Sequence, residues 1–485
     1  MNNRRIRKMK RKVLSLIALL LAATVFCASA SADLYDQDEV QQMAVDAWKQ
    51  AVDAAYQDET RRDEVSPEHQ TIETTYGPYE ADVYSISDGT NTMQYLMQVI
   101  GDPDEYGMYP LYICLHGGGT DAENGQFNNF EWVDMFDYYK GSVTSGIYVA
   151  VRGINNNWNL HFDDASYPLY DRLIEDMIVF CQADPNRVYL LGFSAGGDGV
   201  YAIAPRMADR LAAADESSGH PNGVSLLNVA NLPICIQAGI RDIMFEPLRS
   251  VVAASFDQYL DECRTTCGFG YEHKVYIHVP EGHNYSDYDP EVSSTQEVLT
   301  NPQAFVDAMN DEEFADQFDV NDAYALPDDE ETNSRYRTVI AEAGLETTQA
   351  DTNAVRFVSQ YTREANPANV VWDLTTRATS RETTSFYWLD ADREVNEGLI
   401  VVCFDAETNT FDVDIVEVPN GSFSILLRPS MVDFSQPVYV VYGDQKIEVD
   451  VKLDEELIAS TAADTLDPEM VSAASIDFAS LAWAD

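Results

Sequence analysis

The sequence predicts an α/β fold, with a mostly parallel sheet covered by helices on both faces, followed by an all-β domain. Between about residues 76 and 304, short apolar runs alternate with helix-patterned segments, and the runs are too continuous for a half-exposed sheet. After about residue 355, short strands are separated by Asn, Gly, Pro and Asp, which is typical of a β-sandwich. We therefore expect two folded domains of different class.

The first residues, 1–32, are predicted to be a secretory signal. Seven basic residues come first, the apolar run Val13–Phe26 follows, and small residues surround cleavage points after Ala30 or Ala32. The apolar run is shorter than the roughly 20 residues that a membrane-spanning helix needs. We expect a secreted, extracellular protein with no stable membrane anchor after cleavage.

Composition excludes some partners. The chain has 82 acidic and 30 basic residues, a net charge of −52, which repels nucleic acid and anionic membrane surfaces. Its seven cysteines show no zinc-ligand spacing, so neither a metal nor another cofactor is predicted. Asp287 and Asp289 have a pattern that calcium sometimes uses, but a solvated acidic loop is the expectation there.

The elements of the first half are predicted in chain order. Residues 33–75 form an N-terminal helical extension, with apolar residues at helical spacing between Asp38 and Tyr56. The domain at 76–304 has helices at about 169–182, from about 197, and at about 251–261. Its buried strands are "YPLYICLHGGG", "SGIYVAVRG", Arg187–Leu191, "LPICIQAGI" and "HKVYIHVP".

The second half changes pattern. Residues 305–354 are polar and acidic and are predicted to be a linker with some helix, the alternative being a lid over the site. Residues 355–460 are predicted to form the β-sandwich, and residues 461–485 a loose tail. The predicted strands of the sandwich are "NVVWDL", "TTSFYWLD", "GLIVVCFD", "TFDVDIVEV", "FSILLRP", "PVYVVYG" and "QKIEVDVKL".

One serine lies among small residues directly after a predicted strand. Gly192–Gly196 reads Gly-Phe-Ser-Ala-Gly, a G-x-S-x-G pattern followed by a predicted helix. In that context the serine occupies a strained turn with its Oγ exposed, and the helix N-terminus supports a developing negative charge. An ordinary small-residue turn is the alternative. Ser194 is therefore the predicted nucleophile.

A second glycine-rich segment ends an earlier strand. His116 is followed by Gly117, Gly118 and Gly119, whose amides can face a substrate oxygen without side chains intervening. The amide of Ala195, with that of Gly118 or Gly119, is the predicted oxyanion hole. An ordinary glycine-rich strand exit is the alternative, and His116 is expected to fix the loop rather than to transfer protons.

A nucleophilic serine needs a base and an orienting acid, in the chain order Ser, Asp or Glu, His. His283 follows the last predicted strand of the domain, where catalytic loops gather, and is the predicted base. Asp242 follows the preceding strand and is the predicted acid, with Glu246 as fallback. His116, Trp158 and His161 are predicted to line the substrate site, although Trp158 alternatively packs its own loop down.

Together, "LHGGG", "DPNRVYLLGFSAGG", "GIRD" and "EGH" resemble the α/β-hydrolase superfamily, in family order over about residues 76–290. The closest resemblance is to secreted polyhydroxybutyrate-depolymerase-like and feruloyl-esterase-like enzymes, with prolyl-oligopeptidase-type catalytic domains nearby. It implies a serine hydrolase with Ser194, His283 and Asp242 as triad. The residues after Asp242 depart from the family, because Ile243 and its successors lack the usual Val-Pro-like continuation. The β-rich region resembles Ig-like modules.

The sequence therefore predicts a secreted serine hydrolase that cleaves carboxylic esters, on a small or polymeric substrate that includes polysaccharide-linked esters, through an acyl-enzyme. A prolyl-oligopeptidase-like peptidase is the alternative within the class. Outside it, the alternative is a catalytically inert polysaccharide-binding or surface protein that uses the aromatics Trp372, Tyr387 and Trp388, although alternate strand residues are normally core.

Overall fold

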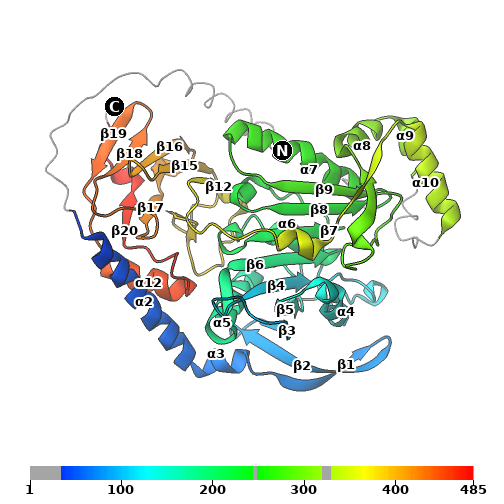
Figure 1. Ribbon diagram of the computed structural model, residues 1–485, viewed down its shortest axis with the longest axis horizontal. Coiled ribbons are helices and arrows are strands. Elements are labelled where there is room, and N and C mark those ends of the chain that lie inside the picture. Colours follow the sequence, from blue (N-terminus) through cyan, green and yellow to red (C-terminus); the bar gives the residue numbers. More distant parts are fainter. Residues whose placement is uncertain (1–33, 244–247, 319–328, 484–485) are drawn as a thin grey trace.

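The computed structural model describes residues 34–243, 248–318 and 329–483, so the predicted signal segment lies outside the described residues. Most of the described chain belongs to one large mixed sheet with helices on both faces, and two smaller sheets lie beside it (Figure 1). The large sheet contains β1 (Glu68–Thr74), β2 (Gly77–Ser87), β3 (Thr92–Ile100), β4 (Tyr109–Leu115), β5 (Gly146–Val151), β6 (Ala183–Phe193), β7 (Ala213–Ser217), β8 (Ile234–Gly239), β9 (His273–His278), β10 (Gln296–Leu299) and β11 (Thr347–Ala350).

The strands of the large sheet lie in the order β1-β2-β3-β5-β4-β6-β7-β8-β9-β10-β11. Pairing is parallel from β5 through β9 and antiparallel at both flanks. The parallel strands are the continuous apolar runs of the sequence, and β5 and β8 are buried along their whole length. The predicted buried strands of this region are confirmed.

Helices cover both faces of the parallel strands. α4 (Glu131–Tyr138) and α11 (Ala354–Val358) pack on one face, while α5 (Tyr167–Cys181), α6 (Ala195–Ile203) and α7 (Arg249–Cys267) pack on the other. Successive residues of a strand point to opposite faces, so Ile113 of β4 packs with the α5–α7 side and Cys114 with the α4 side. The expected α/β layering is confirmed.

The N-terminal extension differs from the prediction. α2 (Gln37–Gln57) and α3 (Glu59–Glu64) are helical as expected, but the chain enters β1 at Glu68. β1 and β2 form a long hairpin that extends from the sheet, and β2 continues the sheet into β3. Alternating polar residues in β1 concealed the strand, because this edge strand is mostly solvent-exposed.

The predicted acidic linker at 305–354 is wrong. The segment contains part of α8 (Pro302–Ala308), α9 (Glu312–Ala315), α10 (Glu330–Glu342) and β11, which pairs antiparallel with β10 and extends the large sheet. Phe305, Phe314 and Tyr336 are buried in the core, whereas the acidic residues lie mostly on exposed faces. Sparse apolar positions therefore hold this segment in place, although its average composition is polar.

The C-terminal strands form two small sheets. Trp372 stacks on Phe386 with ring centroids 5.8 Å apart, and Trp388 lies 5.5 Å from Phe411, so the two sheets pack against each other. Six of the seven predicted segments each contain one strand, whereas "TTSFYWLD" folds as two two-residue strands joined by a turn, and the Ig-like assignment stays a prediction. One sheet is β12 (Asn369–Asp373), β15 (Leu399–Asp405), β16 (Thr410–Val416), β18 (Val438–Tyr442) and β19 (Gln445–Val449), and the other is β13 (Ser385–Phe386), β14 (Leu389–Asp390), β17 (Ser424–Leu427) and β20 (Ala474–Asp477).

Two further expectations about this region are wrong. The tail at 461–485 is ordered where it is described, because α12 (Glu455–Thr465) packs against α2 and β20 pairs with β17. The aromatics Trp372, Tyr387 and Trp388 are buried, so they are not a surface for polysaccharide. Trp372 lies on a strand, whereas Tyr387 and Trp388 form the turn between β13 and β14, and all three side chains pack into the core.

Buried ion pairs join the C-terminal sheets to the large sheet. Arg381 contacts Asp171 of α5 with Nε–Oδ2 at 2.8 Å and Asp209 with Nη1–Oδ1 at 3.0 Å. Arg363 pairs with Asp467 and also donates to the backbone carbonyl of Asp209 at 2.9 Å. The apolar core likewise continues from one part into the other.

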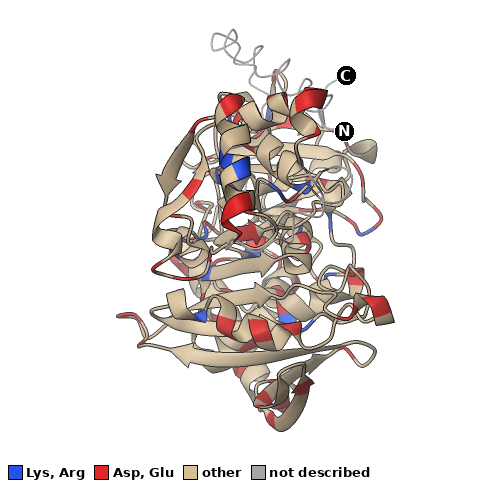
Figure 2. Cartoon of the chain, turned by 90° about the vertical axis from the view of Figure 1, so that its right-hand side faces the viewer, with Lys and Arg blue, Asp and Glu red and all other residues tan. Residues whose placement is uncertain are grey.

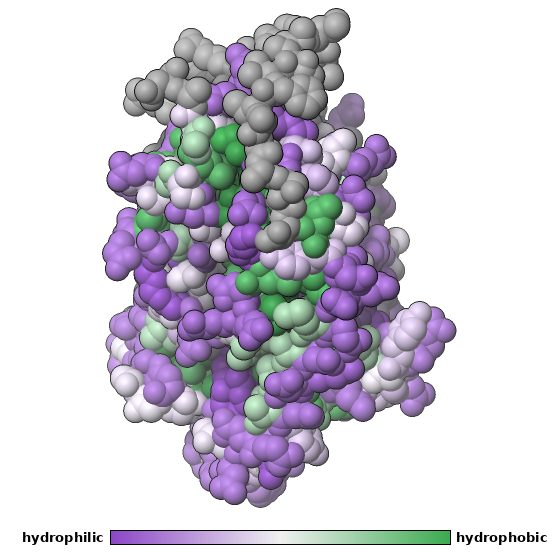
Figure 3. Space-filling view, turned by 90° about the vertical axis from the view of Figure 1, so that its left-hand side faces the viewer, coloured by the Kyte–Doolittle hydropathy of each residue, from purple (hydrophilic) through white to green (hydrophobic). Residues whose placement is uncertain are grey.

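The surface carries the charge that the composition implies. Asp and Glu are spread over the face seen in Figure 2, with Lys and Arg in fewer places. The opposite face is mostly hydrophilic, with smaller apolar areas between polar side chains (Figure 3). Within the described ranges, every helix is too short or too polar to cross a membrane.

Candidate active site

Ser194 occupies a strained turn between β6 and α6. Its backbone has φ 58° and ψ −119°, a region that a residue other than glycine rarely adopts. A Cβ at Gly196 would lie 2.0 Å from the carbonyl oxygen of Leu115, so the residue after Ala195 must be glycine for the turn to approach β4 this closely. The glycines around the serine therefore permit a turn that projects its side chain.

Ser194, His283 and Asp242 form one hydrogen-bonded chain. Ser194 Oγ lies 3.0 Å from His283 Nε2, and His283 Nδ1 lies 2.7 Å from Asp242 Oδ2. A carboxylate only accepts hydrogen bonds, so Nδ1 carries the ring proton and Nε2 is left to accept from the serine hydroxyl. Tertiary structure thus brings together the three residues that the sequence predicts as nucleophile, base and acid.

The three side chains meet because their strands end at the same edge of the sheet. Ser194 follows β6 directly, Asp242 lies three residues beyond β8, and His283 lies five beyond β9. β7 lies between β6 and β8, and its Ser217 carbonyl accepts the Ser194 N–H at 2.8 Å. The carboxyl ends of parallel strands are where ligand-binding loops gather. Glu246, the fallback acid, lies outside the described residues.

The glycine segment after β4 lies against the serine turn. A Cβ built on Gly118 would be 3.4 Å from the Ala195 Cβ, which places the two backbones side by side. The N–H of Gly119 donates to the carbonyl of Phe127 at 3.0 Å, so Gly119 is not a free oxyanion donor and that part of the prediction is wrong. Among the described contacts, the N–H groups of Gly118 and Ala195 remain the pair suited to a developing oxyanion.

His116 and His161 do not line a substrate site, contrary to expectation. Both side chains are buried, and the rings contact each other edge-to-face at 4.6 Å. His161 Nε2 donates to the His116 carbonyl at 2.9 Å, and His116 Nε2 accepts the Gly153 N–H at 3.2 Å. Burial lowers the pKa of His116 to about 4, and burial also lowers the pKa of His161 well below its usual range. The two neutral rings therefore fix the glycine loop.

Trp158 lies at the mouth of the site. Its indole is 49% exposed, packs 4.7 Å from the Phe127 ring, and lies directly over Gly119. Of the three predicted substrate-lining residues it is the one that solvent reaches. Trp158 also packs against its neighbouring loop. Its position is therefore compatible with both predictions, that it lines the substrate site and that it packs the loop down.

A second aromatic wall lies on the histidine side. The Phe193 ring lies 5.3 Å from the His283 ring and 5.5 Å from Tyr138, and Tyr138 lies 4.1 Å from Tyr288, which is 36% exposed. With Trp158 on the oxyanion side, exposed aromatic rings flank the serine on both sides. Such surroundings suit an uncharged, partly apolar substrate group.

Sequence reasoning missed a buried carboxyl pair beneath the site. Asp287, expected to be solvated, is fully buried and accepts hydrogen bonds from Tyr138 and Tyr139 at 3.2 Å and from Ser217 at 2.5 Å. Ser217 Oγ also lies 3.1 Å from Asp215 Oδ1. The Ser217 hydroxyl has one proton to donate, so it can bond to only one of the two carboxyls at a time unless the other is protonated and donates to Ser217 Oγ. The alternation of β7 signals that Asp215 points inward, but the partner is visible only in three dimensions.

Burial shifts the titration of this pair. It raises the pKa of Asp215 to about 7, with the Asp287 charge adding to the shift, and raises the pKa of Asp287 to about 6 despite the hydroxyls that donate to it. The native state therefore binds protons that the unfolded chain releases near pH 4. The resulting stabilisation is fully present below pH 4 and is lost as the pH rises through about 7.

Replacing Asp215 by Asn should remove its part of this pH dependence. We expect the free energy of unfolding of Asp215→Asn, relative to wild type, to improve by roughly 2 to 4 kcal/mol between pH 4 and pH 8. Urea unfolding at each pH measures it. Asp289→Asn is the control, because backbone N–H groups lower the pKa of Asp289 and its contribution runs in the opposite direction. A difference that stays constant with pH would contradict the assignment.

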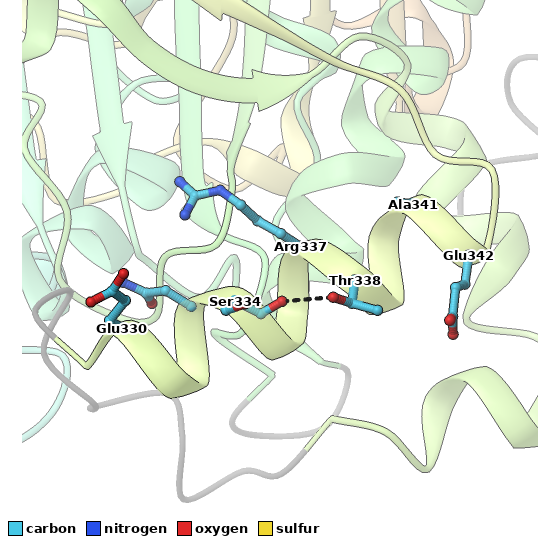
Figure 4. Close-up of a pocket in the computed structure, with 7 residues that line it drawn as sticks. Glu330, Ser334, Arg337, Thr338, Ala341 and Glu342 are labelled. Atoms are coloured by element: carbon cyan, nitrogen blue, oxygen red, sulfur yellow. Dashed lines mark hydrogen bonds between the residues drawn. The ribbon is translucent and has the colours of Figure 1, made fainter.

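A shallow depression elsewhere on the surface is distinct from this site. It runs along one face of α10 and shares no residue with the serine site (Figure 4). Its lining comes from successive turns of that single helix, so no second element walls it. The lining residues are Glu330, Asn333, Ser334, Arg337, Thr338, Ala341 and Glu342.

No protein-family model and no curated protein matches this chain. Several solved structures are similar to it. A thermostable esterase is 19% identical with a TM-score of 0.30, and the match covers 48% of this chain and 60% of the esterase chain. Est1E from Butyrivibrio proteoclasticus is 12% identical with a TM-score of 0.29, and the match covers 47% of this chain and 97% of the Est1E chain. Acetyl xylan esterase from Aspergillus awamori is 13% identical with a TM-score of 0.26, and the match covers 39% of this chain and 82% of that esterase. The chain thus spans 60% of the length of the first of these esterases.

Proposed function

We propose that this protein is an exported serine hydrolase of the α/β-hydrolase superfamily that cleaves carboxylic esters. The observation that carries the proposal is the chain of contacts from Ser194 Oγ to His283 Nε2 at 3.0 Å and from His283 Nδ1 to Asp242 at 2.7 Å. The strained backbone of Ser194 and the paired N–H groups of Gly118 and Ala195 support the same reading.

In the proposed acylation, Ser194 Oγ attacks the ester carbonyl carbon while its proton moves to His283 Nε2. The carbonyl oxygen becomes an oxyanion, which the N–H groups of Gly118 and Ala195 stabilise by roughly 3 to 4 kcal/mol per donor. The intermediate collapses, the bond to the alcohol oxygen breaks, and that oxygen takes the proton from His283. Ser194 is left as an acyl ester.

Deacylation reverses these roles with water. A water molecule gives a proton to His283 Nε2 and attacks the acyl carbon, and the carboxylic acid leaves as Ser194 Oγ regains the proton. Asp242 holds the Nδ1–H throughout and stabilises the imidazolium in each half-reaction. An ester suits this site better than a peptide, because an alkoxide leaves with little assistance.

The substrate we propose is an uncharged ester, either small or attached to a polymer such as a polysaccharide. Exposed rings of Trp158 and Tyr288 flank the serine, and the net charge of −52 disfavours anionic partners. Export, which we propose from the basic and apolar order of residues 1–32, would place the enzyme where such polymers occur.

Covalent labelling tests the proposal directly. The full chain is expressed and both cells and medium are treated with a fluorescent fluorophosphonate, which reacts with activated serines. We expect a labelled protein in the medium, with an N-terminus at residue 31 or 33, and loss of the label in Ser194→Ala. The labelled wild type is then screened with acetyl, feruloyl and hydroxyalkanoate esters and with peptides.

The control is Ser334→Ala, which removes a serine from the α10 depression, outside the proposed active site, and should leave labelling intact. Folded wild-type protein that neither reacts with the probe nor hydrolyses any ester would refute the proposed function. Labelled protein that cleaves peptides and no ester would replace the esterase with a peptidase.

A further inference from the structure

Arg249 contacts both residues that support the proposed nucleophile, and the mechanism above does not use it. It is the first residue of α7, and its Nη1 lies 3.1 Å from Asp242 Oδ1 and 3.2 Å from Oδ2. The same atom lies 3.0 Å from His283 Nδ1. Its side chain is 6% exposed. The guanidinium of Arg249 therefore directly contacts both Asp242 and His283.

The position of Arg249 is fixed by the backbone as well. The N–H of Ser250, the next residue of α7, donates to the Asp242 carbonyl at 2.8 Å, so the start of the helix and the acid loop move together. Asp242 in turn is fully buried. A buried carboxylate needs a cationic or hydrogen-bonding partner to remain ionised. Among the described residues, Arg249 is a cation in direct contact with the Asp242 carboxylate, with Nη1 and Oδ1 3.1 Å apart.

The contact with His283 is electrostatic rather than a hydrogen bond in the active tautomer. Nδ1 has one in-plane position for a proton, and Asp242 Oδ2 at 2.7 Å occupies the direction of that proton. The Arg249 N–H groups can only donate, so none of them bonds to a protonated Nδ1. The guanidinium instead places a positive charge beside the ring, which opposes a second positive charge on it.

We propose that Arg249 is a positioning residue that keeps Asp242 ionised and disfavours protonation of His283 in the resting enzyme, so that the base remains available at acidic pH. This inference rests on the proposed function of the site. Without Arg249, the imidazole is the partner of the buried carboxylate that remains among the described side-chain contacts, and a proton taken up by the ring would supply the missing positive charge. The base would then be occupied before substrate arrives.

Other charged groups near Arg249 also contribute to the electrostatic environment of Asp242 and His283. Asp198 of α6 is buried, which raises its pKa, while the charge of Arg249 acts in the opposite direction. Asp198 also accepts the N–H of His220 at 2.6 Å, so His220 faces the same region. Both stay in place in every variant below, and a change between variants therefore reports on the contact of Arg249 with Asp242 and His283.

The experiment measures kcat/KM for a neutral ester from pH 4 to pH 9. Arg249→Met removes charge and hydrogen bonds, Arg249→Gln removes the charge and keeps a donor, and Arg249→Lys keeps the charge. For the two neutral variants we expect the acid limb of the profile to move up by about one pH unit or more. At pH 5 that is a loss of about tenfold, against less than about threefold on the alkaline plateau. Arg249→Lys should restore most of the wild-type profile.

Arg61→Met is the matched control, because Arg61 also pairs with two buried carboxyls, Glu175 and Asp176, but does so far along the chain from the site. It should leave the profile in place. An equal loss at every pH in the Arg249 variants, or no loss, would overturn the proposal. An inactive, unlabelled wild type would refute the proposed function instead.

Discussion

Replacing His283 by alanine is expected to lower kcat for ester hydrolysis by about 10⁵- to 10⁶-fold, with little change in KM. In the proposed mechanism the imidazole accepts the Ser194 proton, and its Nε2 lies 3.0 Å from Ser194 Oγ. Without it, the serine hydroxyl must lose its proton to water during attack. Substrate binding depends on the surrounding groups and is largely retained. Steady-state hydrolysis of a chromogenic short-chain ester measures both constants.

The matched control is His69→Ala. His69 lies on the exposed hairpin strand β1 and pairs there with Asp82 and Glu80, so its loss should leave kcat unchanged. Asp242→Asn should fall between the two variants, at about 10⁴-fold below wild type, because the amide favours the wrong imidazole tautomer. A His283→Ala enzyme that retains more than about 1% of wild-type kcat would exclude His283 as the base.

Replacing Arg381 by leucine is expected to lower the free energy of unfolding by about 3 to 5 kcal/mol. Arg381 makes two contacts of 3.0 Å or less with Asp171 and one of 3.0 Å with Asp209, and all three residues are buried or nearly so. The substitution removes the cation that the two carboxyls share, and Asp171 keeps only the longer contact of 3.8 Å with Arg210 among its described ion pairs. Urea or thermal unfolding at neutral pH measures the loss.

A surface pair provides the comparison. Arg356 and Asp351 are both exposed, so Arg356→Ala should cost less than about 1 kcal/mol. In the Arg381→Leu background, Asp171→Asn with Asp209→Asn should recover part of the loss, because the stranded charges are then gone. A loss below 1 kcal/mol for Arg381→Leu would show that the C-terminal sheets are joined mainly by apolar contacts.

The sequence was informative about the site wherever the chemistry is local. A serine among glycines between a strand and a helix has few structural uses, and the turn at Ser194 has the strained backbone that this pattern predicts. His283 and Asp242 were predictable because parallel strands place their carboxyl ends at one edge, so residues just beyond β8 and β9 must approach the residue beyond β6.

The same reasoning failed where a polar group that could bind substrate is instead hydrogen-bonded within the protein. Gly119 looks like Gly118 in sequence, but its N–H donates to the carbonyl of Phe127, and a motif does not show how the loop packs. His161 looks like a binding residue because it follows a polar loop, yet its ring turns inward to hold the His116 carbonyl. Arg249 and Asp287 gave no signal, because each acquires its role from partners that are distant in the chain.

The fold shows a parallel division. Continuous apolar strands and amphipathic helices such as α2, α5 and α7 were predictable, because burial of a repeating face requires a repeating pattern. The segment at 305–354 was not, because the four buried aromatics in its described part lie among many acidic residues and do not alter its average composition. Edge strands β1 and β11 were missed for the same reason, since a strand with one exposed edge needs little hydrophobicity to pair.

The sequence by itself determined the α/β and β-rich regions and which residues to propose as nucleophile, base and acid, because a repeating pattern of buried residues and a glycine-rich turn are local features of the chain. Only the tertiary structure decided which amides remain for an oxyanion, that Arg249 shares Asp242 with His283, and that buried carboxyls lie beneath the serine. Charge and hydrogen bonding depend on distance and on competition for a single proton or lone pair, and only folding sets those distances.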